Sequence, residues 1–322
     1  MRTRIVTVAF VFLFVASGTS WAHHVAGISG RGFAGPITTI SATPVSQGKL
    51  PVSIQADFND FDSFSDHEMS GYAEDGEHVH SIDSLFHLSL GIYYGITDDF
   101  SFGVKVPYVK LSNIREAHDE EPDEIHDRGD SQGIGDIILS GQYRFLNLKE
   151  SNLESSLVFG LKLPTGKTGE TDSHGEKFET EFQPGSGSWD PMIGLAATKR
   201  FGLLSLDASI LYNFGTEGSQ DTNLGDTFLY NLALSYRVLQ KGKGSLDLIL
   251  EANGEWIEKQ EISGVKDENS GGNTVFVSPG MRFTYDNKWS GYVSVGLPAI
   301  QDLNGIQNDL TIRTIVGVSV VF

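Results

Sequence analysis

Six of the nine histidines of this 322-residue chain fall in three acidic stretches, residues 65–81, 115–130 and 169–182. They are His67, His78, His80, His118, His126 and His174. Imidazole together with carboxylate suits zinc, nickel or copper, whereas carboxylates alone suit calcium or magnesium. His78 and His80 lie two residues apart, so in an extended strand their side chains would project together. The three stretches are therefore candidates for a divalent metal site.

A second interpretation of these stretches needs no specific metal. They contain no tight zinc motif and no EF-hand spacing. A solvated acidic surface beside lipopolysaccharide would have the same composition. The choice between the two depends on where the stretches lie, and so on the elements that position them.

The start and the composition of the chain indicate export. Residues 1–22 combine Arg2 and Arg4, the apolar run Ile5–Ala16 and small residues up to Ala22, which is typical of a cleaved signal peptide. The apolar run is shorter than the roughly 20 residues of a spanning helix. The absence of cysteine excludes disulfides and thiolate metal sites. The formal net charge of −19 argues against nucleic acid as a partner.

Apolar and polar residues alternate through most of the chain, the pattern of strands with one apolar and one wet face. In 84–94, for example, Leu88 and Leu90 fall on one face, and His87 and Ser89 on the other. The alternating segments are 49–58, 84–94, 100–108, 134–145, 153–164, 191–201, 203–214, 226–238, 245–256, 274–285, 289–298 and 310–322. The sequence thus predicts about twelve strands.

The connections between these segments alternate in length. The short ones are 97–99, 146–152, 202, 239–244 and 286–288, and the long ones are 59–82, 113–132, 165–188, 215–225, 257–273 and 301–309. Outer-membrane barrels show this alternation, because their turns on the periplasmic side are short and their extracellular loops are long. We therefore predict that residues 48–322 form an all-β, single antiparallel up-and-down transmembrane β-barrel in the bacterial outer membrane, in contact with lipid and lipopolysaccharide. The three acidic stretches would then be extracellular.

Two further features bear on this barrel. The chain ends in an alternating segment closed by Phe322, which resembles the assembly signal of outer-membrane proteins and implies the barrel-assembly machinery as a partner. Pro107 and Pro279 fall inside predicted strands, where proline removes a ladder hydrogen bond. They should therefore mark bulges or kinks.

The face opposite the apolar one would line the lumen, and it carries charges of both signs. Its predicted members are His87, Lys105, Asp136, Gln142, Arg144, Lys162, Asp207, Arg237, Asp247, Glu251, Glu255, Arg282 and Arg313. Such a wall forms either a hydrated path for a solute or a packed interior of paired charges. Residues 23–47, rich in glycine and small residues, would be a periplasmic segment that either threads into the lumen as a plug or remains a disordered tail.

Three stretches resemble one known family. They are GIGDIILSGQYRF (133–145), LVFGLKLPTG (157–166) and PGSGSWDPMIGLAATKRFG (184–202). Their Gly-Asp strand start, Leu-Pro-Thr-Gly strand end and Gly-Ser-Gly-Ser-Trp-Asp strand entry are similar to those of the outer-membrane transporters grouped as the phenol-degradation meta-pathway (MetA-like) family. The resemblance extends over residues 84–322. It implies a membrane barrel that passes small, often aromatic or hydrophobic compounds, and it implies no catalytic residues. The acidic, histidine-bearing loops depart from it.

We therefore predict a porin-like channel for passive passage of a small solute, which the resemblance implies to be a hydrophobic or aromatic compound. One alternative is passage or capture of a divalent metal (Zn, Ni, Cu or Ca) through the histidine-bearing loops. Another is a closed barrel that serves as a binding platform. No enzyme is expected, because no nucleophile and base are visibly paired and no Gly-x-Ser-x-Gly elbow occurs. No cofactor is expected apart from such a metal.

Overall fold

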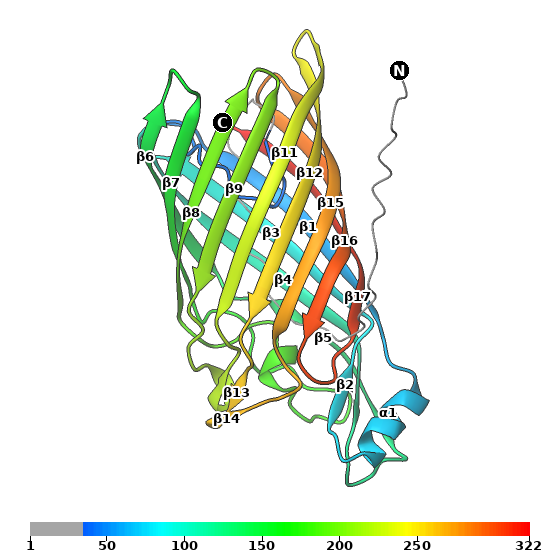
Figure 1. Ribbon diagram of the computed structural model, residues 1–322. Helices are drawn as coiled ribbons and strands as arrows, with labels where there is room; N and C mark the ends of the chain where they lie inside the picture. Colours follow the sequence, from blue (N-terminus) through cyan, green and yellow to red (C-terminus); the bar gives the residue numbers. More distant parts are fainter. Residues whose placement is uncertain (1–34) are drawn as a thin grey trace, which may run out of the picture.

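The computed structural model describes residues 35–322 (Figure 1). The predicted signal peptide (1–22) and residues 23–34 of the segment predicted to precede the barrel lie outside the described residues. The described chain forms a closed antiparallel β-barrel of twelve strands, which confirms the predicted fold class. The barrel strands are β1 (Pro51–Asp62), β3 (Ser84–Gly95), β4 (Phe100–Ala117), β6 (Ile138–Leu148), β7 (Leu153–Lys162), β8 (Asp190–Phe201), β9 (Leu204–Asn213), β11 (Thr227–Lys241), β12 (Gly244–Ile257), β15 (Gly272–Tyr285), β16 (Trp289–Leu303) and β17 (Asp309–Val321).

The barrel closes because its first and last strands pair. β1 and β17 are antiparallel, from Pro51 opposite Val321 to Asp62 opposite Asp309. The other barrel strands pair in chain order, as an up-and-down topology requires. Phe322, the residue predicted as assembly signal, exchanges main-chain hydrogen bonds of 3.1 and 3.2 Å with Leu50. Closure satisfies main-chain groups that lipid cannot satisfy.

Side chains on the barrel strands alternate between an exposed apolar face and a buried polar face. In β3, Leu88, Leu90 and Ile92 are 40–42% exposed, whereas His87 and Ser89 are at most 8% exposed. An apolar outer face over a polar interior is the arrangement of a barrel that stands in lipid.

Within residues 35–322, no helix has the length and apolar character needed to cross a membrane.

The two ends of the barrel differ (Figure 1). The short turns and the C-terminus lie at one end, and the long connections, with their small elements, gather at the other. We call the second the loop end. Its elements are α1 (Asp66–Glu74), β2 (Val79–Ser81), β5 (Ile125–Ile134), η1 (Thr180–Phe182), η2 (Ser219–Asp221), β10 (Thr222–Asn223), β13 (Glu261–Ile262) and β14 (Val265–Lys266).

The acidic stretch 115–130 is a β-hairpin and not the loop that the sequence predicts. β4 continues to Ala117 and β5 returns beside it, with Ala117 opposite Ile125, so only residues 118–124 connect the two strands. This part of the hairpin extends beyond the apolar outer band, so neither of its faces has to be apolar. It therefore lacks the alternation from which the other strands could be predicted.

The predicted strand 134–145 is interrupted. β5 ends at Ile134 and β6 begins at Ile138, and β4 changes its partner from β6 to β5 between Lys105 and Tyr108. Pro107 lies at this change of partner. A proline is tolerated here because the ladder on this side of β4 is already broken and no N–H is required.

Pro279 lies at a second gap in strand pairing. The register between β15 and β16 stops after Val277, opposite Leu297, and resumes at Gly280, opposite Ser294. As at Pro107, the proline occupies a position where its missing N–H costs no ladder bond on that side. Both prolines thus mark irregular places in the wall.

Candidate functional site

The residues predicted to line the lumen lie on the buried face of the wall. Arg144, Lys162 and Arg237 have side chains that are 10–12% exposed. The others are less than 9% exposed: His87, Lys105, Asp136, Gln142, Asp207, Asp247, Glu251, Glu255, Arg282 and Arg313. Asp136 differs from the rest because it follows β5 in the break before β6 and belongs to neither strand.

Ion pairs join these charges to one another or to further carboxylates of the wall. Arg313 Nε lies 3.0 Å from Asp57 Oδ1, and Arg237 Nε lies 2.8 Å from Asp247 Oδ1. Such pairing offsets the cost of taking the charges out of water. Asp57 was not among the predicted lumen residues, although its place in the alternating segment 49–58 puts it on the inner face.

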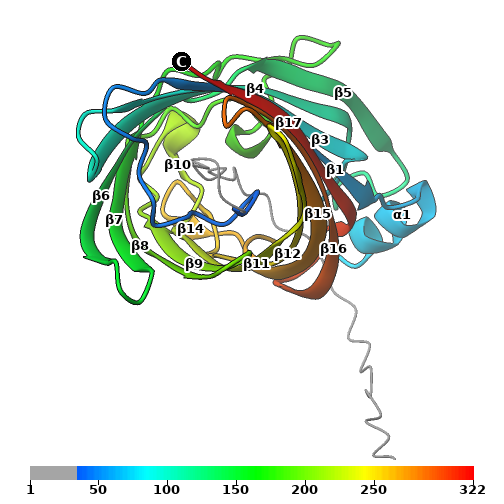
Figure 2. The same ribbon diagram turned by 90° about the horizontal axis from the view of Figure 1, so that it is seen from above.

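Residues 36–43, which we call the inner segment, lie inside the ring of strands (Figure 2). The carboxylate of Glu251 accepts hydrogen bonds from the main-chain N–H groups of Ile37, Thr38 and Thr39, at 2.9–3.2 Å. Three consecutive N–H groups directed at one buried carboxylate form a charge-assisted anchor. Glu251 therefore fixes one end of the inner segment to β12.

The rest of the inner segment is held by other side chains of the wall. Arg282 Nη2 donates to Pro36 O at 2.6 Å, Gln142 Nε2 donates to Ser41 O at 2.6 Å, and Thr198 Oγ1 accepts from Ala42 N at 2.8 Å. Ile40 and Ala42 also pack against apolar side chains of the wall, which are Ile138, Val158, Met192, Ala196, Leu211 and Leu229. The inner segment thus runs from β15 and β12 towards β6 and β8, and its anchors are side chains.

The interior is apolar near the loop end. Side chains of the strands pack there with two phenylalanines of the connection between β7 and β8. This buried cluster, the aromatic layer, contains Phe61, Ile82, Leu85, Val109, Leu111, Ile114, Phe178, Phe182, Phe276 and Leu310. Arg313 lies at its inner border, with its guanidinium carbon 5.7 Å from the centre of the Phe276 ring. The interior therefore changes from apolar at the loop end to charged further in.

The three stretches that carry the family resemblance meet at the break between β5 and β6. The carboxylate of Asp136 accepts hydrogen bonds from Gly166 N, Ser186 N and Ser186 Oγ, each at 2.8 Å. A Cβ added to Gly166 would lie 2.7 Å from the Cα of Gly185, so both positions require glycine. Lys167 N donates to Ile134 O at 2.8 Å, which ties β5 to the connection after β7. These motif residues therefore build the wall where strand pairing stops.

Four of the six predicted metal-binding histidines come together at the loop end. β2 pairs with β4 and places His80 opposite Glu116, while β5 places His126 opposite Glu116 on the other side. The ring of His118 stacks on that of His78 with 4.4 Å between centroids, and His126 lies 5.3 Å from His118. The pairing of three short strand segments, which the sequence did not predict, brings these histidines into one cluster.

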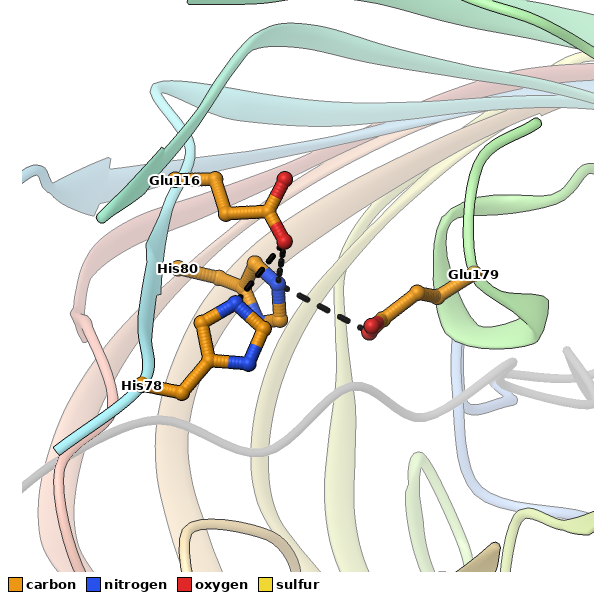
Figure 3. Close-up of side chains that lie close together, drawn as sticks. All are labelled: His78, His80, Glu116 and Glu179. Atoms are coloured by element: carbon orange, nitrogen blue, oxygen red, sulfur yellow. Dashed lines mark hydrogen bonds and ion pairs between the residues drawn. The ribbon is translucent and has the colours of Figure 1, made fainter. Parts of the chain in front are cut away.

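Glu116 lies at the centre of this histidine cluster (Figure 3). Its Oε1 is 2.8, 3.2 and 3.4 Å from Nε2 of His78, His80 and His118, respectively. Its Oε2 pairs with Arg128 Nη1 at 2.7 Å. Glu179 approaches from the connection between β7 and β8, and its Oε2 lies 3.6 Å from His80 Nε2. Neither glutamate could be distinguished in the sequence, because the acidic stretches contain many equivalent carboxylates.

The surrounding carboxylates determine the charge of His80. Burial opposes its protonation, but the hydrogen bond to Glu116 and the charges of Glu179 and Glu181 outweigh burial and raise the pKa of His80 to about 9. Burial also raises the pKa of Glu181, to about 7, although the charge of His80 acts in the opposite direction. The carboxylates around His80 therefore favour a positive charge at this position of the acidic pocket.

The remaining two predicted ligands lie elsewhere. His67 is an exposed residue of α1. His174 is exposed in a turn, where its main-chain N–H donates to Asp172 Oδ1 at 2.9 Å. Among residues 35–322, the group with metal-ligating atoms close enough to share one ion is His78, His80, Glu116 and Glu179. Neither His67 nor His174 belongs to this group.

The closed barrel, its apolar outer face and its polar interior define a transmembrane β-barrel of the outer-membrane type. The chain belongs to the family described as "Putative MetA-pathway of phenol degradation", whose model matches residues 69–298, and this confirms the resemblance found in the sequence. Among curated proteins, no sequence matches this chain.

Solved structures agree with the fold. The chain is similar to the COG4313 outer membrane channel from Pseudomonas putida F1, with a TM-score of 0.62 at 16% identity, over 87% of this chain and 98% of that one. The NanC porin is a more distant match, with a TM-score of 0.47 at 7% identity, over 84% of this chain and 98% of that one. At 16% identity, the first likeness establishes a shared barrel fold.

Proposed function

We propose that this protein is a passive outer-membrane channel for a small aromatic or otherwise hydrophobic solute. The observation that carries the proposal is the inner segment, which occupies the interior through bonds to side chains such as Glu251 and Thr198. Barrels of about twelve strands are intermediate between those filled by their own side chains and those with an open channel. One chain segment is therefore enough to set the width of the path.

The aromatic layer supports a hydrophobic solute. Phe178, Phe182 and Phe276 are at most 2% exposed and lie inside the loop end of the barrel, where a solute from outside would enter. Once the connection between β7 and β8 moves aside, an aromatic ring would find stacking and apolar contacts on these side chains. The family description, which names phenol degradation, refers to the same class of small aromatic compound.

The charged side chains between the aromatic layer and the short-turn end of the barrel, which we call the charged zone, support passive movement of the solute. Asp57, Asp247, Arg237 and Arg313 supply both signs of charge, so the wall favours neither cations nor anions strongly. A solute that leaves the aromatic layer would next pass the inner segment. The path is thus apolar at its entrance, mixed in charge further in, and narrowed by residues 36–43.

A planar-bilayer recording of the unaltered protein tests this proposal against the closed platform. We expect discrete conductance steps, because a hydrated path beside the inner segment would carry ions. A bilayer that stays silent after verified insertion of folded protein would contradict the channel and favour a platform that only presents its loops.

A further inference from the structure

Two residues of the histidine cluster, together with two glutamates, have the geometry of a metal site. One ligand atom each from His78, His80, Glu116 and Glu179 lies within 4.8 Å of all the others. The separations of Glu116 Oε1 from the two histidine Nε2 atoms are 2.8 and 3.2 Å, and Glu179 lies 3.6 Å from His80. Four ligands bound tetrahedrally to zinc lie about 3.3 Å from one another, as bond lengths near 2.0–2.1 Å dictate. The 2.8 Å pair would have to open by about half an ångström, and the more distant pairs would have to close.

We infer that His78, His80, Glu116 and Glu179 bind one divalent transition-metal ion of the zinc type at the loop end of the barrel. Two imidazoles and two carboxylates suit such an ion, whereas calcium and magnesium take oxygen ligands. His118, whose Nε2 lies 3.4 Å from Glu116 Oε1, is next to the site, and its ring stacks on that of His78.

The convergence on Glu116 favours a cation over simple hydrogen bonding. Three imidazole nitrogens lie within 3.4 Å of the single oxygen Oε1. A carboxylate oxygen has two lone pairs, so it cannot accept well from all three rings. One ion placed between these groups would satisfy the carboxylate and the imidazole lone pairs together.

Groups outside the four ligands already hold them in place. His80 Nδ1 faces Glu181 Oε1 at 3.6 Å, so the ring lies between a ligand position and a second carboxylate. Arg128 holds the other oxygen of Glu116 at 2.7 Å and is itself fixed by Asp172, 2.8 Å away. Such outer carboxylate–histidine contacts orient the imidazole in most protein metal sites.

The site also has an entry path and joins separate elements. A cleft of about 390 Å³ opens onto His78, His80, Glu179 and Glu181, and its acidic lining would attract cations. The four ligands come from the stretch around β2, from β4 and from the residue before η1. A bound ion would therefore fasten β2 and the connection between β7 and β8 to the wall. This inference does not depend on what the channel carries.

Zinc titration of protein purified from outer membranes and stripped with a chelator tests the site. Calorimetry should show one tightly bound zinc ion per chain. In His80→Ala, the affinity for zinc should be at least about 100-fold lower. Glu181→Gln, which leaves all four ligands in place, should weaken binding about 10-fold or more. The double variant His67→Ala, His174→Ala is the matched control and should bind as the unaltered protein does.

Cobalt(II) binding to the unaltered protein supplies a second readout, in case His80→Ala does not fold. A strong visible d–d absorption that zinc abolishes is expected for a four-coordinate site, and a weak octahedral spectrum would overturn the inference. Zinc affinity that is unchanged in folded His80→Ala or in Glu181→Gln would overturn it as well. So would an equal loss of affinity in the His67, His174 control.

Discussion

Replacing Glu251 by alanine is expected to raise the single-channel conductance several-fold. The carboxylate holds the N–H groups of Ile37, Thr38 and Thr39, and each buried N–H left without a partner costs about 1–3 kcal/mol. In the variant, hydrogen bonds from these N–H groups to water would be more favourable than leaving the groups unpaired against the wall. The inner segment should therefore leave the wall. Its release would widen the narrowest part of the path, and planar-bilayer recordings would show larger steps.

Two controls separate release of the inner segment from a change in charge. Asp247→Ala removes a carboxylate from the same strand and the same inner face, where it pairs with Arg237, and should not release the inner segment. Cysteines at Ser41 and Thr198, whose side-chain oxygens lie 3.1 Å apart, would lock the segment to β8 in a chain without other cysteines. Glu251→Ala should then conduct like the unaltered protein until a reductant is added. Unchanged steps in reduced Glu251→Ala would show that the inner segment does not limit the path.

Replacing Asp136 by alanine is expected to lower the free energy of unfolding by about 3 kcal/mol, because three donors would lose one buried acceptor. Gly166 N, Ser186 N and Ser186 Oγ all bond to this carboxylate. They join the break between β5 and β6 to the connection between β7 and β8, at the place where β5 pairs with β4 alone among the described strands. The loss should therefore loosen the wall locally as well as destabilise the barrel.

The urea midpoint of the gel-mobility shift between folded and unfolded barrel measures this loss. Asp99→Ala is the matched control, because it removes an aspartate whose side chain is 56% exposed in its pair with Arg144, and should cost about 1 kcal/mol or less. Equal midpoints for Asp136→Ala and Asp99→Ala would contradict a supporting role for the motif residues.

The barrel could be predicted because lipid imposes a pattern on the sequence. Every second residue of a spanning strand has to be apolar, and this alternation, with the alternating lengths of the connections, was sufficient for twelve strands. The hairpin of β4 and β5 could not be found in this way, since its outer part leaves the membrane. The break at 135–137 was hidden for a different reason. The predicted strand was extended back to Ile134, but the structure places Ile134 on the outer face, 49% exposed, and Ile138 on the inner face, 6% exposed. Only Pro107 on the neighbouring strand indicated an irregularity.

The histidine cluster was only partly predictable. The spacing of His78 and His80 indicated that their side chains project together, and the structure places both beside Glu116. The choice of Glu116 and Glu179 depends on the pairing of β2 with β4 and on the fold of the connection after β7. Glu116 is 36 residues from His80 in the chain, so no local spacing rule connects them. His67 and His174 have the same composition around them, but they lie on separate exposed elements.

The most direct test of the proposed function is flux of two carboxylates of similar mass into liposomes that contain the unaltered protein. One is aromatic, such as 4-hydroxybenzoate, and the other is an aliphatic sugar acid. Because both carry the same charge, a difference between them reports on the aromatic layer rather than on the charged zone. We predict that the aromatic compound enters faster, and that protein-free liposomes show neither flux. Equal entry of the two, or faster entry of the sugar acid, would contradict a channel built for hydrophobic solutes.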